Sequence, residues 1–458
     1  MNLASRISRT VALAALCATP MIAAAQTQSF VDVKPSPQQI AWQDLEFGVI
    51  IHFSTNTFLN REWGDGTASP SVFNPTQFDP DQWMQAIKAA GAKYVVLVAK
   101  HHDGFCLWPT AQTDYSVKAS PWENGKGDVV GDVARAAHKY GLQFGVYLSP
   151  WDRHDPRYKD AAAYDRYYNA ELAELAQNYG NLVELWLDGA GSAGHVYDFD
   201  KIIETLRTYQ PNTIVFADTA LFEYGDARWV GNEDGRVTYE DWDVIDRHGY
   251  VRWRPVEADT PLRAGHWFWH PNDEKSLKSV DQLLTTWDET VGRGAQLMLG
   301  LAPDNRGLLP DADVARLKEF GQALRARYTQ NLALTGHAQT TTEDALDGNP
   351  DTFWSAPAGS THSQIEVRFA RPVTFNRALT MEWLNDGQRI EKYSIDVWTG
   401  RGWKSVASAH AIGHEKIDIF PVVTASRVRL YILSSVNGAA IREFQLYNVP
   451  ESPAQAPR

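Results

Sequence analysis

The middle of the chain alternates short apolar segments with segments of helical spacing, and this alternation limits the possible folds more than any other feature. Helical spacing marks Asp81–Ala90, Val129–Tyr140, Ala161–Tyr179, Asp200–Tyr209, Val280–Val291 and Asp311–Tyr328. The apolar segments are Gly48–Phe53, Tyr94–Ala99, Phe144–Leu148, Leu182–Leu187, Thr213–Ala217 and Ala295–Leu299, with weaker ones near Ala227–Val230 and Ala264–Phe268. Nearly all-apolar strands are typical of a parallel sheet covered on both faces. Eight such units predict an α/β fold of the (β/α)8 TIM-barrel type, and a doubly wound sheet is the alternative that periodicity leaves open.

Polar, titratable and aromatic residues stand at the end of almost every predicted strand. They are His52, His101 and His102, Tyr147, Asp188, Asp218, Glu233 after the weak sixth strand, and Trp267 in the seventh. A single residue of this kind could be an ordinary loop residue. Residues of this kind after nearly every strand are not readily explained as unrelated loop residues. A barrel keeps its active site at the carboxyl ends of its strands, so the sequence predicts the site there.

The chain changes character after about Thr335, where alternating stretches such as Gln364–Phe369 and Ser426–Tyr431 are separated by glycine turns. Short strands with turn signals and no helical period predict an antiparallel β-sandwich. We therefore expect a catalytic barrel over residues 26–335, a sandwich over 336–450 and a flexible tail over 451–458.

The first residues have the pattern of an export signal. Arg6 and Arg9 precede the apolar run Val11–Ala18, which is too short to span a bilayer, and Ala23–Ala25 supplies small residues for cleavage. We expect residues 1–25 to be removed and the protein to be periplasmic or secreted, without a membrane anchor. Cys106 is then the only cysteine of the mature chain, so no internal disulfide is expected.

Composition narrows the range of partners. The net charge of −13 disfavours nucleic acid and anionic membranes, which both need a cationic surface. The 17 Trp, 18 Tyr and 18 Phe suit a sugar ligand whose C–H faces stack on rings, although core packing accounts for most of them.

Two carboxylates are the main candidates for chemistry. Asp188 ends an apolar strand, where a buried charge is costly without a purpose, and Gly189 lets a ligand approach the backbone. Glu233 follows a later strand, with Asp234 and Glu240 as neighbouring competitors. Two carboxyl groups flanking one bond are the machinery of a glycosidase, whereas the simpler interpretation is a loop-capping aspartate and a solvated glutamate.

Two other patterns compete with this interpretation. Gly189–Gly194 matches a dinucleotide fingerprint, but Asp188 would repel the pyrophosphate and the next helix starts too late to face it. His52, His101 and His102 favour a metal-dependent hydrolase, but adjacent histidines on an extended segment point to opposite sides. The chain has no H-E-x-x-H motif, and hydrogen bonds to sugar hydroxyls explain three histidines without a metal.

Six ordered stretches resemble the α-L-fucosidases of glycoside hydrolase family 29. They are Gly48–Ser54, Arg61–Gly64, Lys100–Phe105, Gly145–Ser149, Leu185–Gly189 and Trp229–Glu233. The resemblance covers about residues 36–330 and implies a retaining, exo-acting enzyme on a (β/α)8-like barrel that needs no cofactor for catalysis.

The resemblance also implies residue roles. Asp188 is expected to be the nucleophile and Glu233 the acid/base. The pocket for the hydroxyls and the apolar face of fucose is expected to consist of His52, Glu62, Trp63, His101, His102, Tyr147, Trp186 and Trp267. The stretches Trp229–Glu233 and Trp253–Asp259 look like the branch restricted to α-1,3 and α-1,4 linkages. Fucosylated oligosaccharides or glycoconjugates are the implied substrates. A fucose-binding protein without turnover is the rival expectation.

The tail resembles discoidin-like (F5/8 type C) modules through Ala345–Ser355 and Ile441–Phe444. Such modules often hold a structural calcium ion. The resemblance implies Asp347, Thr352 and Glu443 as its ligands, and oxygen ligands of this kind suit calcium.

Overall fold

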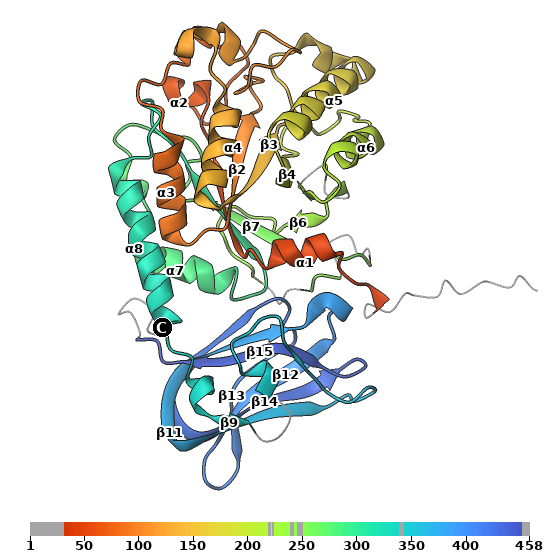
Figure 1. Cartoon of the computed structure of the whole chain (residues 1–458), viewed down its shortest axis with the longest axis vertical. Coiled ribbons are helices and arrows are strands. Elements are labelled where there is room, and N and C mark those ends of the chain that lie inside the picture. The colour runs from red at the N-terminus through yellow and green to blue at the C-terminus, as the bar shows by residue number, and fades with distance from the viewer. Residues whose placement is uncertain are drawn as a thin grey trace, which may run out of the picture.

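The computed structural model describes residues 32–218, 221, 224–238, 242–244, 251–338 and 343–450. Within these ranges, eight parallel strands close into a barrel in sequence order, so the predicted barrel is confirmed and the doubly wound sheet is wrong (Figure 1). The strands are β1 Phe47–Ile51, β2 Tyr94–Lys100, β3 Gln143–Leu148, β4 Leu182–Leu187, β5 Ile214–Ala217, β6 Ala227–Trp229, β7 Val256–Pro261 and β8 Gln296–Leu301. The predicted export signal and the tail after 450 lie outside the described residues.

Helices form the outer layer of the barrel. They are α1 Pro37–Gln43, α2 Thr55–Leu59, α3 Pro80–Ala90, α4 Val129–Tyr140, α5 Ala161–Asn178, α6 Phe199–Tyr209, α7 Val280–Glu289 and α8 Asp311–Arg327. Aspartates 79, 128, 160 and 198 accept a backbone N–H at the starts of α3 to α6, and glycines 91 and 141 in the left-handed region end α3 and α4. These local signals explain why the helices are predictable from sequence.

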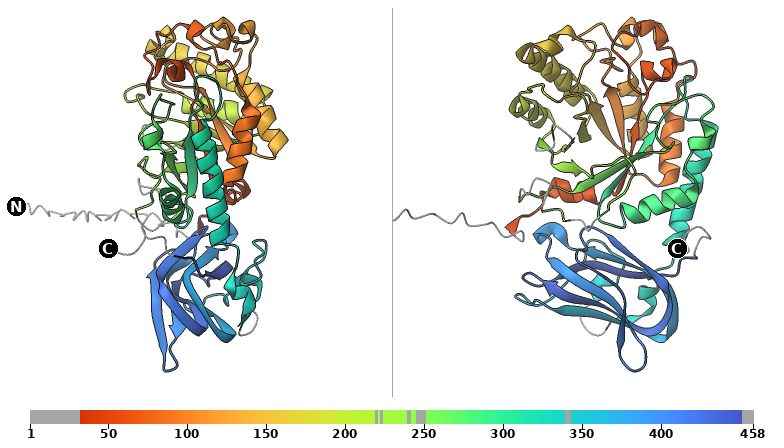
Figure 2. Two further views of the ribbon diagram at one scale, coloured as in Figure 1. Left: turned by 90° about the vertical axis from the view of Figure 1, so that its left-hand side faces the viewer. Right: turned by 180° about the vertical axis from the view of Figure 1, so that it is seen from behind.

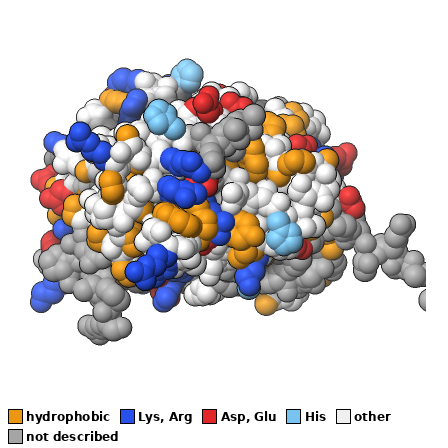
Figure 3. All heavy atoms as spheres, turned by 90° about the horizontal axis from the view of Figure 1, so that it is seen from below, with side chains coloured by type: hydrophobic (Ala, Val, Ile, Leu, Met, Phe, Trp, Pro, Cys, Tyr) orange, Lys and Arg blue, Asp and Glu red, His pale blue; other side chains and the backbone are white. Residues whose placement is uncertain are grey.

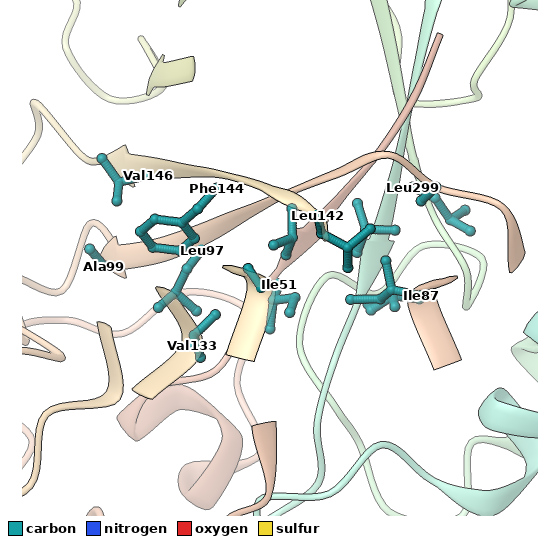
Figure 4. Close-up of a cluster of buried hydrophobic side chains, with 14 of the residues drawn as sticks. Ile51, Ile87, Leu97, Ala99, Val133, Leu142, Phe144, Val146 and Leu299 are labelled. Atoms are coloured by element: carbon teal, nitrogen blue, oxygen red, sulfur yellow. The ribbon is translucent and has the colours of Figure 1, made fainter. Parts of the chain in front are cut away.

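The barrel strands are buried on both faces because successive side chains alternate between two cores. Ile50 and Val96 point into the barrel with Tyr94, whereas Ile51 and Leu97 belong to the outer core under the helices. Figure 4 shows part of this outer core, where Leu97 and Ile51 lie among side chains of neighbouring elements. Because both faces of these strands are buried, nearly every residue in them is apolar.

The seventh strand is not where the sequence predicts it. Residues 264–268 form no strand, and the barrel instead uses β7, which pairs with β6 and β8. This strand contains Glu257 and Asp259, both buried, and ends at Pro261, so it lacks the apolar pattern of its neighbours. Trp267 therefore lies in the loop after β7 rather than within a strand.

The second part of the chain is an antiparallel sheet domain, as predicted. Its strands follow the order β10-β15-β11-β14-β12-β13, and β9 pairs with β11. They are β9 His337–Ala338, β10 Trp354–Ser355, β11 Ser363–Glu382, β12 Ile390–Trp398, β13 Trp403–Ala409, β14 Lys416–Ser435 and β15 Ala440–Tyr447. Register shifts interrupt the pairing of β11 with β14, and the sheet curves around its own hydrophobic core (Figure 2).

Arginines and aromatic rings alternate across this sheet. The Arg427 guanidinium lies over the Trp398 and Trp403 rings, and the Arg429 guanidinium lies over the Trp403 and Tyr431 rings at 4.5 and 4.2 Å from their centroids. Basic and hydrophobic side chains also neighbour one another on the end of the molecule seen in Figure 3. Because guanidinium groups are attracted to the faces of aromatic rings, these contacts of Arg427 and Arg429 stabilise the sheet.

The two domains share a hydrophobic core. Leu379, Met381, Ile417 and Tyr447 of the sheet belong to the same buried cluster as the outer barrel core, and the Tyr447 ring meets the Tyr328 ring edge-on at 5.1 Å. No helix in the described part of the chain is long and apolar enough to cross a bilayer.

Candidate active site

The carboxyl ends of the barrel strands bring the predicted site residues together. Asp188 directly follows β4, and its Oδ2 accepts a hydrogen bond from Tyr147 Oη of β3 at 3.0 Å. His102, two residues after β2, places Nε2 3.4 Å from the same oxygen. The backbone N–H of Ala190 donates to Oδ1 at 2.8 Å. Three elements therefore converge on one carboxyl group.

Asp188 is held as a carboxylate. Burial alone would raise its pKa, but the hydrogen bond and charge of His102, the Ala190 N–H and the Tyr147 hydroxyl outweigh burial, and the net pKa is lowered. About 20% of the Asp188 side chain is exposed, so a ligand can reach it. Burial and the neighbouring Asp188 charge also raise the pKa of Tyr147 well above its ordinary value, so Tyr147 stays a hydrogen-bond donor.

The three predicted histidines form one cluster. The ring centroids of His101 and His102 are 4.2 Å apart, and those of His52 and His101 are 5.8 Å apart. The expectation that adjacent histidines point to opposite sides is wrong, because residues 101 and 102 lie in the turn beyond β2 and not on an extended segment. Burial lowers the pKa of His52 to about 3, and burial with its histidine neighbours lowers that of His101, so both rings are neutral.

Aromatic rings form the floor beside Asp188. Trp186 stacks on Phe216 with centroids 3.9 Å apart and on Tyr147 at 5.6 Å. Its indole N–H donates to Glu257 Oε1 at 2.7 Å, in the barrel interior. The stacked rings and the hydrogen bond to the buried Glu257 carboxyl group therefore fix the orientation of the Trp186 indole.

Glu233 lies in the exposed loop after β6, and Trp267 connects it to the pocket. The indole N–H of Trp267 donates to Glu233 Oε2 at 3.2 Å, and the same ring contacts His52 with centroids 5.1 Å apart. His52 in turn contacts Tyr147, the partner of Asp188. A continuous series of contacts therefore joins the two predicted catalytic carboxyl groups.

Glu62 positions the loop that carries Trp267. Its carboxylate accepts hydrogen bonds from the backbone N–H groups of Trp267, at 2.9 Å, and Phe268, and it pairs with His270 Nε2 at 2.5 Å. About 32% of its side chain stays exposed. Its predicted contact with sugar remains a prediction.

Trp151, which lies beyond the carboxyl end of β3, is an aromatic residue near the site that the sequence motifs do not single out. The Trp151 ring lies 5.2 Å from His102 and 5.5 Å from Trp63, centroid to centroid, and the Trp63 side chain is exposed by 52%. Trp151 comes shortly after the end of β3, which is the signal that could have identified it.

The glycine-rich segment after Asp188 packs against this rim and does not open a helix. Helix α6 begins at Phe199, well after Gly194, so no helix start faces the segment. Gly191 has a φ of +71°, and a Cβ there would lie 2.0 Å from the Trp151 ring. The dinucleotide interpretation therefore has no support in the geometry.

In the sheet domain, the three predicted calcium ligands lie close together. Thr352 Oγ1 is 2.9 Å from Asp347 Oδ2, and 2.9 Å from the Asn349 carbonyl oxygen. Glu443 is 1% exposed and its Oε1 has no partner within the described residues. Burial and the neighbouring Asp347 raise the pKa of Glu443 to about 7, which a cation between the two acids would reverse. The described residues contain no group of three His, Cys, Asp or Glu placed to hold a metal.

A cavity of about 1430 Å³ lies at the opposite end of the barrel, under the amino ends of β3, β4 and β5. None of the predicted site residues lines it. The predicted site residues lie at the other end of the barrel, beyond the carboxyl ends of the strands.

Comparison with known proteins agrees with this geometry. Residues 16–328 match the Alpha-L-fucosidase family, and residues 329–444 match the F5/8 type C domain. Alpha-L-fucosidase 1 of Arabidopsis thaliana is 35% identical over 426 residues, which cover 86% of this chain and 83% of the relative.

Two solved structures have the same fold as this chain and match it over most of its length. The structure of SpGH29 is 33% identical with a TM-score of 0.85, covering 91% of this chain and 99% of that one. A Ruminococcus gnavus GH29 fucosidase in complex with fucose is 27% identical with a TM-score of 0.84, covering 92% and 96%. With its closed barrel, its match to the family over residues 16–328 and these relatives, the chain belongs to the alpha-L-fucosidase family of glycoside hydrolases.

Proposed function

We propose that the protein is an exo-acting, retaining α-L-fucosidase in which Asp188 is the nucleophile and Glu233 the acid/base. The observation that carries this assignment is the environment of Asp188, a partly exposed carboxylate that three donors hold ionised at the carboxyl end of β4. Glu233 stands in an exposed loop, and the rings of Trp267, His52 and Tyr147 connect it to Asp188.

The reaction takes two displacements. Asp188 Oδ attacks the anomeric carbon of fucose while the protonated Glu233 gives its proton to the leaving glycosidic oxygen, so the sugar–oxygen bond breaks and a fucosyl ester forms. Water then attacks the same carbon and loses a proton to the Glu233 carboxylate. The ester bond breaks, fucose leaves and both carboxyl groups return to their starting states.

The surrounding side chains suit a 6-deoxy sugar. We expect the edges of the Tyr147 and Trp186 rings to border the methyl group. The Nδ1 atoms of His52 and His101 have no hydrogen-bond partner among the described residues, so they suit the hydroxyls. His102 faces Asp188 at the same end of the barrel. Buried partners left unpaired would penalise a sugar that lacks those hydroxyls. We expect Trp63, which is half exposed and whose ring contacts His102, to complete this pocket.

Replacing each carboxylate tests these roles. Asp188→Ala is expected to abolish release of fucose while fucose still binds, whereas a binding protein without turnover has no activity to lose. Glu233→Ala is expected to slow fucose release strongly, with Asp234→Ala as the matched control in the same loop. Equal losses in the Glu233→Ala and Asp234→Ala variants would remove the assignment of Glu233.

We further propose that the enzyme prefers α-1,3 and α-1,4 linkages on branched glycans, because Trp229–Glu233 and Trp253–Asp259 resemble that branch of the family. In the structure, these stretches lie side by side, since Val230 N donates to Glu257 O. Incubation with branched and linear fucosylated oligosaccharides tests the preference. Equal release from α-1,2-fucosylated linear chains would contradict it.

A second proposal concerns the sheet domain, which we expect to hold a structural calcium ion through Asp347, Thr352 and Glu443. Removal of calcium by chelation is expected to lower the thermal midpoint of the protein, with calcium restoring it. The Glu443→Gln variant should show a smaller shift. Fucosidase activity lost on chelation and restored by zinc would instead favour the metal-dependent hydrolase.

Finally, we propose that the protein is exported after cleavage behind Ala25. Protein recovered from the periplasm or the medium should begin at Gln26. A mature protein that starts at Met1 in the cytoplasm would contradict this proposal.

A further inference from the structure

The hydrogen bonds behind Asp188 determine where a proton must lie. Ser149 follows β3 and is fully buried. Its hydroxyl donates to the Trp151 carbonyl oxygen at 2.6 Å, and a carbonyl oxygen can only accept. Since a serine hydroxyl has one hydrogen, Ser149 Oγ has only acceptor capacity left for its second neighbour.

That second neighbour is His102 Nδ1, at 2.8 Å from Ser149 Oγ. The contact is a hydrogen bond only if Nδ1 carries a hydrogen. The other ring nitrogen, Nε2, faces Asp188 Oδ2 at 3.4 Å. A neutral ring with its hydrogen on Nδ1 would point a lone pair at the carboxylate, which is repulsive inside a buried pocket. A second proton must therefore lie between His102 and Asp188.

The proton belongs on the histidine. Asp188 also accepts hydrogen bonds from Tyr147 and from the Ala190 N–H, and these donors favour its ionised form. The other groups that face His102 are His52 and His101, which are neutral, and the buried carboxyl group of Asp103. His102 is thus the charged member of the histidine cluster.

We propose that Ser149 is a positioning residue that keeps His102 as an imidazolium against Asp188. This inference rests on the proposed role of Asp188 as nucleophile. The cation keeps Asp188 ready as a carboxylate in a pocket that would otherwise favour its neutral form. The same cation stabilises the carboxylate that leaves when water breaks the fucosyl ester, so both displacements depend on it.

The first experiment compares the pH dependence of kcat/KM for Ser149→Ala and the wild type. Without an acceptor for Nδ1, His102 loses its charge and Asp188 takes up protons at higher pH. We expect kcat/KM to fall about 10- to 100-fold on the acidic side, and the loss to shrink as the pH rises. The acidic limb should move to higher pH.

Ser116→Ala is the matched control. Ser116 is equally buried, and its hydroxyl has no hydrogen-bond partner among the described residues. It should leave the acidic limb where the wild type has it. A uniform loss of activity across pH in Ser149→Ala would mean a merely structural role and would overturn the proposal.

The second experiment needs no stable variant at Ser149. Nitrogen-15 spectra of histidine-labelled wild-type protein, with His102 assigned by its absence in His102→Gln, should show both ring nitrogens of His102 protonated at neutral pH. A neutral ring would overturn the proposal. Retained turnover in Asp188→Ala would instead refute the proposed function while the imidazolium signal stood, so the two failures are distinguishable.

Discussion

At the scale of single residues, the sequence identifies which groups carry chemistry but not how they meet. Asp188 and Glu233 could be singled out because each acid follows a strand. The turn that brings the His101 and His102 rings within 4.2 Å of each other depends on backbone geometry after β2, which no periodicity encodes. The position of Trp151 shortly after β3 could have marked it as a rim residue, but its contact with His102 depends on how the loop folds back.

Trp267 gives the first prediction at this scale. Trp267→Phe should keep the ring beside His52 but remove the indole N–H that donates to Glu233. Because the donor favours one orientation of the acid/base, we expect kcat to fall about tenfold with a smaller change in KM. Steady-state kinetics check this. Trp398→Phe in the sheet domain is the control, and equal effects of both substitutions would contradict the prediction.

His52 gives the second prediction. Burial lowers its pKa from 6.5 to about 3, so the folded protein leaves it neutral while the unfolded chain protonates it below about 6.5. The contribution of His52 to the free energy of unfolding therefore falls as the pH drops from about 6.5 towards 3. In His52→Gln this slope should be shallower by about one proton, or about 1.4 kcal/mol per pH unit. Urea unfolding between pH 4 and 7 measures it.

The exposed His138 supplies the control for that measurement. His138→Gln removes a histidine from the end of α4 without opening the pocket. If His52→Gln follows the wild-type slope throughout this range, His52 is not buried in its neutral form.

At the scale of elements, the sequence predicts strands and helices wherever burial and local capping agree. β7 is the exception because its interior face is polar. Glu257 accepts hydrogen bonds from Trp186 and from Tyr94 Oη at 3.3 Å, and a second buried acid, Glu184 of β4, lies near it. A strand whose inward residues are acids does not show the apolar run of a barrel strand, so only the closed barrel reveals it.

These inward acids lead to a prediction about pH. Burial raises the pKa of Glu257 from 4.5 to about 7, although the Trp186 hydrogen bond opposes the shift. The folded protein therefore keeps a proton that the unfolded chain releases, and the contribution of Glu257 to the free energy of unfolding falls as the pH rises from about 4.5 to about 7.

Glu257→Gln does not titrate, so its stability relative to the wild type should improve across that window. Denaturant unfolding at pH 5, 6 and 7 measures the difference. Glu289→Gln, at the end of α7 and outside the barrel, is the matched control. A constant difference between Glu257→Gln and the wild type at all three pH values would contradict the prediction.

At the scale of the whole molecule, the change of pattern in the sequence predicts the division into barrel and sheet. It does not predict how the two domains pack against each other. Besides the shared hydrophobic core, Arg442 Nη1 pairs with Asp44 Oδ1 at 2.6 Å and His414 Nε2 lies 3.3 Å from Glu46 Oε1. The partners are far apart in the chain. An apolar residue of β11 or β15 gives no sign of whether it faces its own core or the barrel.

Because apolar residues of both domains form one cluster, we expect the protein to unfold in a single thermal transition. Phe375 is fully buried within the sheet core and belongs to no barrel cluster. Phe375→Ala should cost about 3–5 kcal/mol, and the temperature at which fucosidase activity is lost should fall together with the calorimetric midpoint. Ile419→Ala, half exposed on the same domain, should change neither. Two calorimetric transitions, with heat inactivation of Phe375→Ala unchanged, would show that the barrel is stable without its neighbour. The shared core would then only connect the two domains, and the barrel would fold independently.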